Sequence, residues 1–201
     1  MDAVEVTSPP ASAEMRRRQL LEAALAVFAR HGYRKTSMDD VAQAAGVSRQ
    51  GLYLHFPTKE DLFRAAVLHA LRRSQSAVAL ALATPGTTLE DRLVRAFDEW
   101  VGQFVEAVGS DVDDLVAVCQ TLLGSAVDEQ KRIFCERVAA ALDDAGLARS
   151  YARAGLSADD LATTLCATAG GLKVTETTRA GFVAAMRRAI RALCLPLAGD
   201  A

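Results

Sequence analysis

Apolar residues recur along this chain with helical spacing, and turn residues separate the helices that they predict. Leu21, Ala24, Leu25 and Phe28 form a 3.6-residue stripe, which predicts a first helix over 15–30. The same pattern predicts eight further helices, over 37–45, 49–56, 58–83, 88–108, 111–123, 126–144, 157–177 and 179–195. No stretch makes a convincing strand. The predicted fold class is therefore all-α.

A stretch of 24 residues, TSMDDVAQAAGVSRQGLYLHFPTK, predicts two short helices joined by a tight turn. Ser37 and Asp40 have the spacing of a capping box, which begins the first of them. Gly46 ends that helix, because glycine adopts the left-handed conformation without steric cost. Ser48 then caps a second helix, which ends before Pro57. Two short helices in this arrangement are typical of a helix-turn-helix.

The second of these helices has an apolar side and a polar side. Leu52 and Phe56 are predicted to point inward, and Arg49, Gln50 and Tyr53 are predicted to share the opposite side. A short helix with arginine, glutamine and tyrosine on its outer face suits the DNA major groove. The pattern therefore predicts a DNA-reading helix.

The sequence from Arg16 to about Leu71 resembles the TetR family of bacterial transcriptional regulators. The resemblance rests on four strings, which are LLEAALAVFARHGYRKTS, AAGVS, LYLHF and KEDLF. It implies a three-helix DNA-binding head followed by a helical body for ligand binding and dimerisation. We accordingly expect a disordered tail over 1–13, the head over 14–60 and the body over 61–198.

The resemblance also implies how the head binds double-stranded DNA. Arg49 and Gln50 would read base edges, and Gly51 would allow close approach to the groove. The positions that match phosphate contacts in the family are Thr36, Ser37, Ser48, Tyr53, His55 and Lys59. Lys35 and the run Arg16–Arg18 would add further contacts. Ser48 is needed as a helix cap without DNA as well, and Tyr53 could equally pack on the surface.

In this family the body binds a small-molecule effector, which changes the separation of the two DNA-binding heads. We expect an apolar pocket lined by the middle helices, with Trp100, Phe104, Cys119 and Phe134 as its candidate residues. Core packing explains each of these four residues equally well.

The last two helices carry apolar stripes that predict a homodimer contact. The stripe residues are Leu161, Leu165, Thr168, Leu172, Phe182, Met186, Ile190 and Leu193. Two helices from each subunit would form a four-helix bundle about a two-fold axis. The alternative is that both stripes complete the core of a single chain.

Charge is distributed unevenly along the sequence. Residues 14–73 carry 11 Lys/Arg against 6 Asp/Glu, whereas residues 74–201 carry 12 against 17. This asymmetry predicts a basic DNA-facing head on an acidic body. No uninterrupted apolar run reaches membrane-spanning length, and the N-terminal residues lack the pattern of a secretory signal. The expected protein is cytoplasmic and does not bind membranes.

The cysteines and histidines show no spacing typical of a metal site, so we expect no metal and no cofactor. The four cysteines, Cys119, Cys135, Cys166 and Cys194, are predicted to be reduced core residues. No catalytic signature such as HExxH, GxSxG or a P-loop is present, so no enzyme is predicted. The sequence favours a ligand-responsive repressor that binds a palindromic operator as a dimer. A regulator gated by cysteine oxidation and a transcriptional activator are the alternatives.

Overall fold

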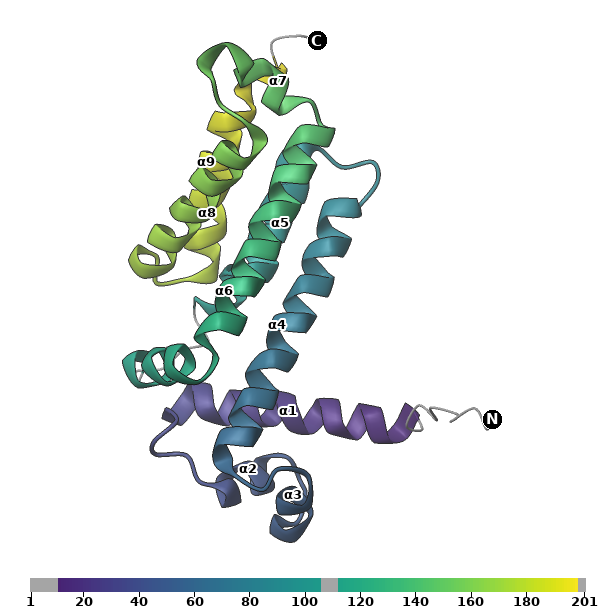
Figure 1. The fold of residues 1–201 in the computed structure, drawn as a ribbon, viewed down its shortest axis with the longest axis vertical. Coiled ribbons are helices and arrows are strands. Elements are labelled where there is room, and N and C mark those ends of the chain that lie inside the picture. The colour runs from purple at the N-terminus through teal and green to yellow at the C-terminus, as the bar shows by residue number, and fades with distance from the viewer. Residues whose placement is uncertain (1–10, 106–111, 199–201) are drawn as a thin grey trace, which may run out of the picture. The chain divides into compact units, whose positions relative to one another are not determined.

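The structure is a computed structural model that describes residues 11–105 and 112–198 (Figure 1). These residues form nine α-helices and two short 3-10 helices, and they contain no strand. The all-α prediction is therefore confirmed. The chain divides into two compact units, Met1–Ala70 with Ser110–Val118 and Leu71–Gly109 with Cys119–Ala201.

The first unit contains α1 (Ala11–His31), α2 (Met38–Ala44), α3 (Arg49–His55) and the start of α4 (Lys59–Ala83). Its core is built from side chains that the 3.6-residue pattern placed on one face of each helix. Phe28, Leu52 and Phe63 are completely buried, and the Phe28 and Phe63 rings meet edge to face at 5.1 Å. Helix α3 packs on α2, and the burial of Leu52 compensates for the low intrinsic stability of so short a helix.

Side-chain caps set where the short helices begin. The Ser37 hydroxyl accepts from the Asp40 amide, while the Asp40 carboxylate accepts from the Ser37 amide at 2.8 Å. The Ser48 hydroxyl accepts from the Gly51 amide at the start of α3. Gly46, with a φ of +66°, turns the chain between α2 and α3. The predicted caps and the predicted glycine turn are confirmed.

The second unit contains the rest of α4, α5 (Leu89–Trp100), most of α6 (Val112–Asp144) and the C-terminal helices. These are α7 (Leu147–Tyr151), α8 (Ala158–Thr175) and α9 (Arg179–Ala198), and the 3-10 helices are η1 (Gly102–Phe104) and η2 (Ala152–Ala154). Helix α9 packs on α5 and α8, and Figure 1 shows α8 and α9 side by side.

Ion pairs add to the packing between α5 and α9. Arg179 donates two hydrogen bonds to the Asp98 carboxylate, at 2.7 and 2.8 Å, and Arg187 donates one to Asp91 at 2.8 Å. The bidentate geometry fixes the two helices in register, although exposed pairs contribute little stability individually.

Helix boundaries differ from the predictions in the second unit. The predicted helices 111–123 and 126–144 are one helix, α6, because a single glycine at 124 costs only about 1 kcal/mol relative to alanine. The predicted helix 88–108 ends at Trp100, where η1 follows; its last residues, 106–108, lie outside the described residues. The short helix α7 was not predicted. Helix α9 reaches Ala198 and passes Pro196, the residue that we expected to end it.

None of the helices in the described ranges combines the length and the hydropathy of a membrane span.

Candidate nucleic-acid interface and cavity

The outward face of α3 includes the predicted Gln50 and one residue that was not predicted, Leu54, and the predicted Arg49 and Tyr53 are also exposed. Leu52 and Phe56 are buried, so at about 100° per residue the opposite side of the helix falls at Gln50 and Leu54. Leu54 is 79% exposed. It was not among the predicted contact residues, although its angular spacing from Leu52 and Phe56 indicates an outward position.

Arg49 lies at the side of this face and joins α3 to α2. Its Nη1 donates to the Asp39 carboxylate at 2.8 Å, and its Cζ lies 5.6 Å from the centre of the Tyr53 ring. Both charged side chains are more than half exposed, so this ion pair contributes little to stability. Arg49 can therefore exchange Asp39 for a base edge or a phosphate at small cost.

The hydroxyl groups predicted as phosphate ligands are already engaged within the protein. Thr36 is only 2% exposed, and its hydroxyl donates to the carbonyl of Gly32 at 2.7 Å. The Ser37 hydroxyl donates to the Asp40 carboxylate at 2.7 Å, which also holds the pKa of Asp40 below its ordinary value. The Ser48 hydroxyl caps α3, and a Cβ at Gly51 would approach it to 3.0 Å. These residues shape the backbone around α2 and α3.

Lys59 is tied to the loop between α1 and α2. Its ammonium donates to the carbonyls of Tyr33 and Thr36 at 3.0 Å and of Arg34 at 3.4 Å. It also lies 4.5 Å from the centre of the Tyr33 ring, a cation–π contact. A lysine ammonium has three donors, so these carbonyls occupy all of them. The predicted phosphate contact of Lys59 would require at least one of these bonds to break.

Tyr53, His55 and Lys35 are exposed, as a DNA contact requires. A groove of about 550 Å³ lies in the same unit, and it is lined by residues of α1 and α3 that include Arg16, Arg17 and His55. The Arg17 guanidinium lies 5.1 Å from the centre of the Phe56 ring, which fixes the start of α1 beside α3. The groove therefore places Arg16 and Arg17 beside Gly51 and His55 of α3.

The second unit encloses an apolar cavity of about 370 Å³. Three of the four predicted pocket residues, Trp100, Phe104 and Phe134, line it, whereas Cys119 does not. Trp100 stacks on Phe134 at 5.1 Å with 14° between the ring planes, and Phe97 meets Phe134 edge to face at 5.0 Å. The cavity thus has an aromatic wall.

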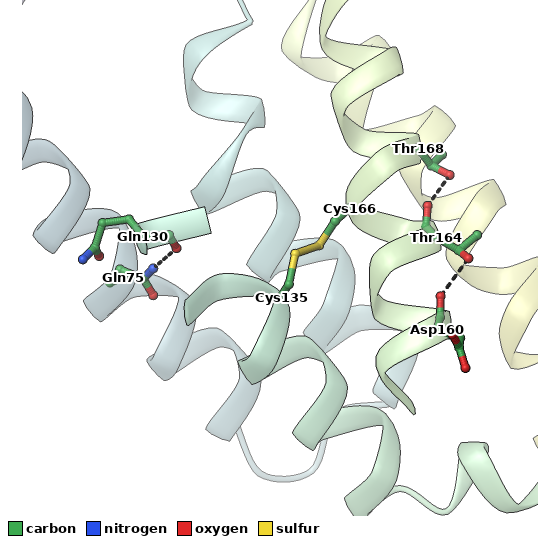
Figure 2. The surroundings of a disulfide bond; sticks show 7 residues. All are labelled: Gln75, Gln130, Cys135, Asp160, Thr164, Cys166 and Thr168. Carbon is green, nitrogen blue, oxygen red and sulfur yellow. Dashed lines mark hydrogen bonds between the residues drawn. A yellow bond between two sulfur atoms is a disulfide. The ribbon is translucent and has the colours of Figure 1, made fainter. Parts of the chain in front are cut away.

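Two cysteines in the cavity wall form a disulfide, contrary to the prediction that all four are reduced. Cys135 of α6 and Cys166 of α8 are bonded, with their Cα atoms 6.6 Å apart (Figure 2). That separation lies within the range that a disulfide can span. The sequence did not reveal the pairing, because the two residues are 31 positions apart and follow no spacing motif.

The remaining cysteines, Cys119 and Cys194, are free thiols, and burial raises the pKa of each. In the described part of the chain, no group of three or more His, Cys, Asp and Glu side chains is arranged to hold a metal ion.

Most residues predicted for the dimer contact lie inside a single chain. Leu161, Leu165, Phe182, Met186 and Ile190 are each at most 2% exposed and belong to one core cluster. These five residues therefore belong to the core of a single chain, which was the alternative to a dimer contact. Thr168, Leu172 and Leu193 are half-buried. A partner chain would have to contact the outward faces of α8 and α9 instead.

The fold and the exposed helix α3 define a helix-turn-helix DNA-binding protein. A model of the bacterial regulatory proteins of the tetR family matches residues 20–66. An uncharacterised HTH-type transcriptional regulator of Bacillus subtilis, YezE, is 32% identical over 149 residues, which cover 70% of this chain and 73% of that protein. The chain belongs to the TetR family of bacterial transcriptional regulators.

Other relatives match over shorter stretches of the chain. The protein named "Probable acrEF/envCD operon repressor" of Escherichia coli (strain K12) is 49% identical over 47 residues, or 23% of this chain and 21% of that protein. The transcriptional activator FasR of Mycolicibacterium smegmatis is 41% identical over 91 residues, or 45% of this chain and 41% of that protein.

Solved structures share the fold over nearly the whole chain. A TetR-like transcriptional regulator from Rhodococcus sp. RHA1 is 26% identical with a TM-score of 0.60, and the match covers 96% of this chain and 100% of that one. A cysteine-substituted CifR bound to 26-bp double-strand operator DNA is 25% identical with a TM-score of 0.59, and the match covers 87% of this chain and 94% of that one.

Proposed function

We propose that this protein is a ligand-responsive repressor that binds a palindromic operator as a homodimer and is released by a small-molecule effector. The observation that supports the proposal is the presence, in one chain, of a helix-turn-helix with an exposed second helix and a separate compact unit with an apolar cavity. An effector can shift such a protein from a DNA-binding to a released conformation only if it binds the two conformations with different affinity. The cavity is the proposed binding site for that effector.

For the DNA contacts, we propose that Gln50 and Leu54 face the bases and that Arg49 reaches a neighbouring base or phosphate. Glutamine can bond adenine N6 and N7, and a leucine can contact the thymine methyl group. We propose that Lys35, Tyr53 and His55, with amides at the starts of α2 and α3, position the phosphates.

We propose that the homodimer forms through the outward faces of α8 and α9. Val174 on α8 is 84% exposed and Leu195 on α9 is 60% exposed, so both apolar side chains are accessible to a partner helix. At Gly170 and Gly171 an added Cβ would meet nothing within 4 Å, so the α8 surface is open there for close approach of another helix.

Fluorescence anisotropy would test the proposal on the protein's own upstream intergenic DNA and on a scrambled duplex. We expect the upstream DNA to bind about 10³-fold or more tightly at near-physiological salt. Equal weak binding of both duplexes would contradict an operator at that place, and selection of bound genomic fragments would then locate it. Transcription in vitro from the bound promoter would fall for a repressor and rise for an activator, the alternative that FasR illustrates.

A redox-gated regulator is a second candidate, and the Cys135–Cys166 disulfide favours it. One hydrogen peroxide would oxidise the two thiols, forming the S–S bond and releasing two waters. Operator affinity would be compared before and after reduction with dithiothreitol. A change that disappears in Cys135→Ser, but persists in Cys194→Ser, would support redox gating; equal affinity in both states would exclude it.

A further inference from the structure

The two lysines of the second unit line the same cavity. Lys131 of α6 and Lys173 of α8 are the only lysines after residue 70, and the other basic residues there are arginines. Both belong to the lining of the cavity that Trp100 and Phe134 border. The body as a whole is acidic, with 12 Lys/Arg against 17 Asp/Glu over 74–201. The cavity therefore carries two positive charges, although the part of the chain that forms it is acidic overall.

The other described residues of the lining carry no opposing charge. Among the described residues that border the cavity there is no aspartate or glutamate, and apolar residues predominate. Lys131 pairs with Asp128 at 3.2 Å, but both side chains are about 60% exposed, so a ligand could displace this pair cheaply. Lys173 has no ion pair within the described part of the chain, and its charge is available to a ligand.

The two ammonium groups also act on a common region. Burial raises the pKa of the Cys119 thiol, and the charges of Lys173 and Lys131 oppose that shift. Both charges therefore act on the same thiol. The shared cavity lining brings the two lysines, on α6 and α8, to one site, although they are 42 positions apart in the sequence.

We propose that the effector is an amphipathic carboxylate, with an apolar body in the cavity and its carboxylate bonded by Lys131 and Lys173. This inference rests on the proposed function, because it names the chemistry of the same ligand site. The aromatic wall of Phe97, Trp100 and Phe134 offers apolar contact to the body of the ligand. A cationic ligand would meet two like charges, and no carboxylate stands among the described lining residues to offset them.

The cavity volume limits the size of such a ligand. About 370 Å³ lies near the lower end of the range for small-molecule sites, which favours a medium-chain or a bicyclic aromatic acid over a long acyl chain. Both kinds of acid share the same chemistry, and the experiment has an arm for each.

Trp100 is the only tryptophan of the chain and lines the cavity, so its fluorescence reports binding directly. Full-length protein would be titrated with octanoate, octan-1-ol and octyltrimethylammonium, which share one chain and differ in charge. Calorimetric titration with 2-naphthoate and 2-naphthol provides the aromatic arm. We expect the carboxylate to bind at least tenfold more tightly than the alcohol in one arm or both, and the cation to bind least.

The double variant Lys131→Met/Lys173→Met should lose this preference while it keeps its affinity for the alcohol. Arg132→Met is the matched control, because it removes a neighbouring cation of α6 that does not line the cavity, and it should keep the preference. Circular dichroism would establish that both variants are folded.

Three results would overturn the inference. If the alcohol binds as tightly as the carboxylate, or if the double variant keeps the preference, the cavity takes ligands but the lysines do not select their charge. If no probe of either arm changes Trp100 fluorescence or produces heat, the cavity is no ligand site, and that part of the proposed function fails as well.

Discussion

The ammonium of Lys59 lies 3.0 Å from the Tyr33 carbonyl oxygen and 4.5 Å from the centre of the Tyr33 ring. Its remaining donors reach the carbonyls of Arg34 and Thr36. A residue expected to hold a DNA phosphate therefore holds the loop that leads into α2. Burial, and then the charge of Glu60, raise the pKa of the Tyr33 phenol, which agrees with a ring packed inside this loop.

The first prediction separates these two roles of Lys59. Lys59→Met should lower the free energy of unfolding by about 1–3 kcal/mol, because the carbonyls lose a charged donor. Operator affinity should fall, but the dependence of log K on log salt should keep its slope, because no phosphate contact is lost. Urea unfolding and anisotropy at several salt concentrations measure the two effects.

Lys35→Met is the control for that experiment, because Lys35 is exposed on the same loop. Its loss should reduce the salt slope by about 0.9 if it holds one phosphate. A similar reduction for Lys59→Met would show that Lys59 gives up its carbonyls for a phosphate when DNA binds.

The second prediction concerns Leu54, whose side chain is 79% exposed on α3. If it contacts a thymine methyl group, replacing that thymine by uracil should weaken binding of the wild-type protein. Leu54→Ala should bind the two operators equally, because the methyl group has then lost its partner. Anisotropy with operators substituted at single thymines provides the measurement. A uracil effect of the same size in both proteins would remove Leu54 from base readout.

The third prediction is a count of thiols. Denatured protein that was never reduced should show two reactive thiols per chain, Cys119 and Cys194, and four after reduction. In the folded protein both free thiols should react slowly at neutral pH, because burial raises the pKa of each. Labelling with a chromogenic disulfide reagent measures the numbers and the rates. Four thiols before reduction would refute the bond.

The same bond should stabilise the second unit. For cysteines 31 positions apart, the chain-entropy model gives about 3–4 kcal/mol. Cys166→Ser should lose roughly that amount in urea unfolding without reductant. Cys194→Ser controls for removal of a half-buried thiol, and its loss should be much smaller.

The fourth prediction tests whether α6 continues through Gly124. Gly124→Ala should stabilise the protein by about 0.5–1 kcal/mol, because alanine favours a helix interior. The added Cβ would approach only the end of the Gln120 side chain, at 3.0 Å, which can rotate away. Thermal unfolding shows whether the substitution stabilises or destabilises the protein. Destabilisation would indicate that the chain breaks at this glycine, as the sequence pattern suggested.

The sequence predicted the parts of the fold that local chemistry determines. Ser37 with Asp40, and Ser157 with Asp160, have the spacing of capping boxes, and both boxes form. Gly46 adopts the left-handed conformation that its position between two helices required. Such signals lie within a few residues of each other, so no knowledge of the tertiary structure was needed.

The features that the sequence did not reveal depend on contacts between distant segments. Cys135 and Cys166 meet only because α6 and α8 pack together. Phe182 and Met186 have the pattern of a contact stripe, yet an apolar stripe is the same whether a neighbouring helix or a second chain covers it. For Lys59, family resemblance gave the residue a partner in DNA, whereas the folded chain provides three carbonyls.

The shortness of α3 limits how much information this protein can take from DNA sequence. Seven residues present Gln50 and Leu54 outward with Arg49 at the side, which corresponds to about three base pairs per half-site at one contact each. Two half-sites would then single out roughly one sequence in several thousand, whereas a genome offers about 10⁶–10⁹ competing sites. Most of the discrimination must come from elsewhere, through the spacing of the half-sites and the shape and bendability of the duplex. Substitutions at operator base pairs that no side chain touches should therefore weaken binding as much as substitutions at the base pairs under α3.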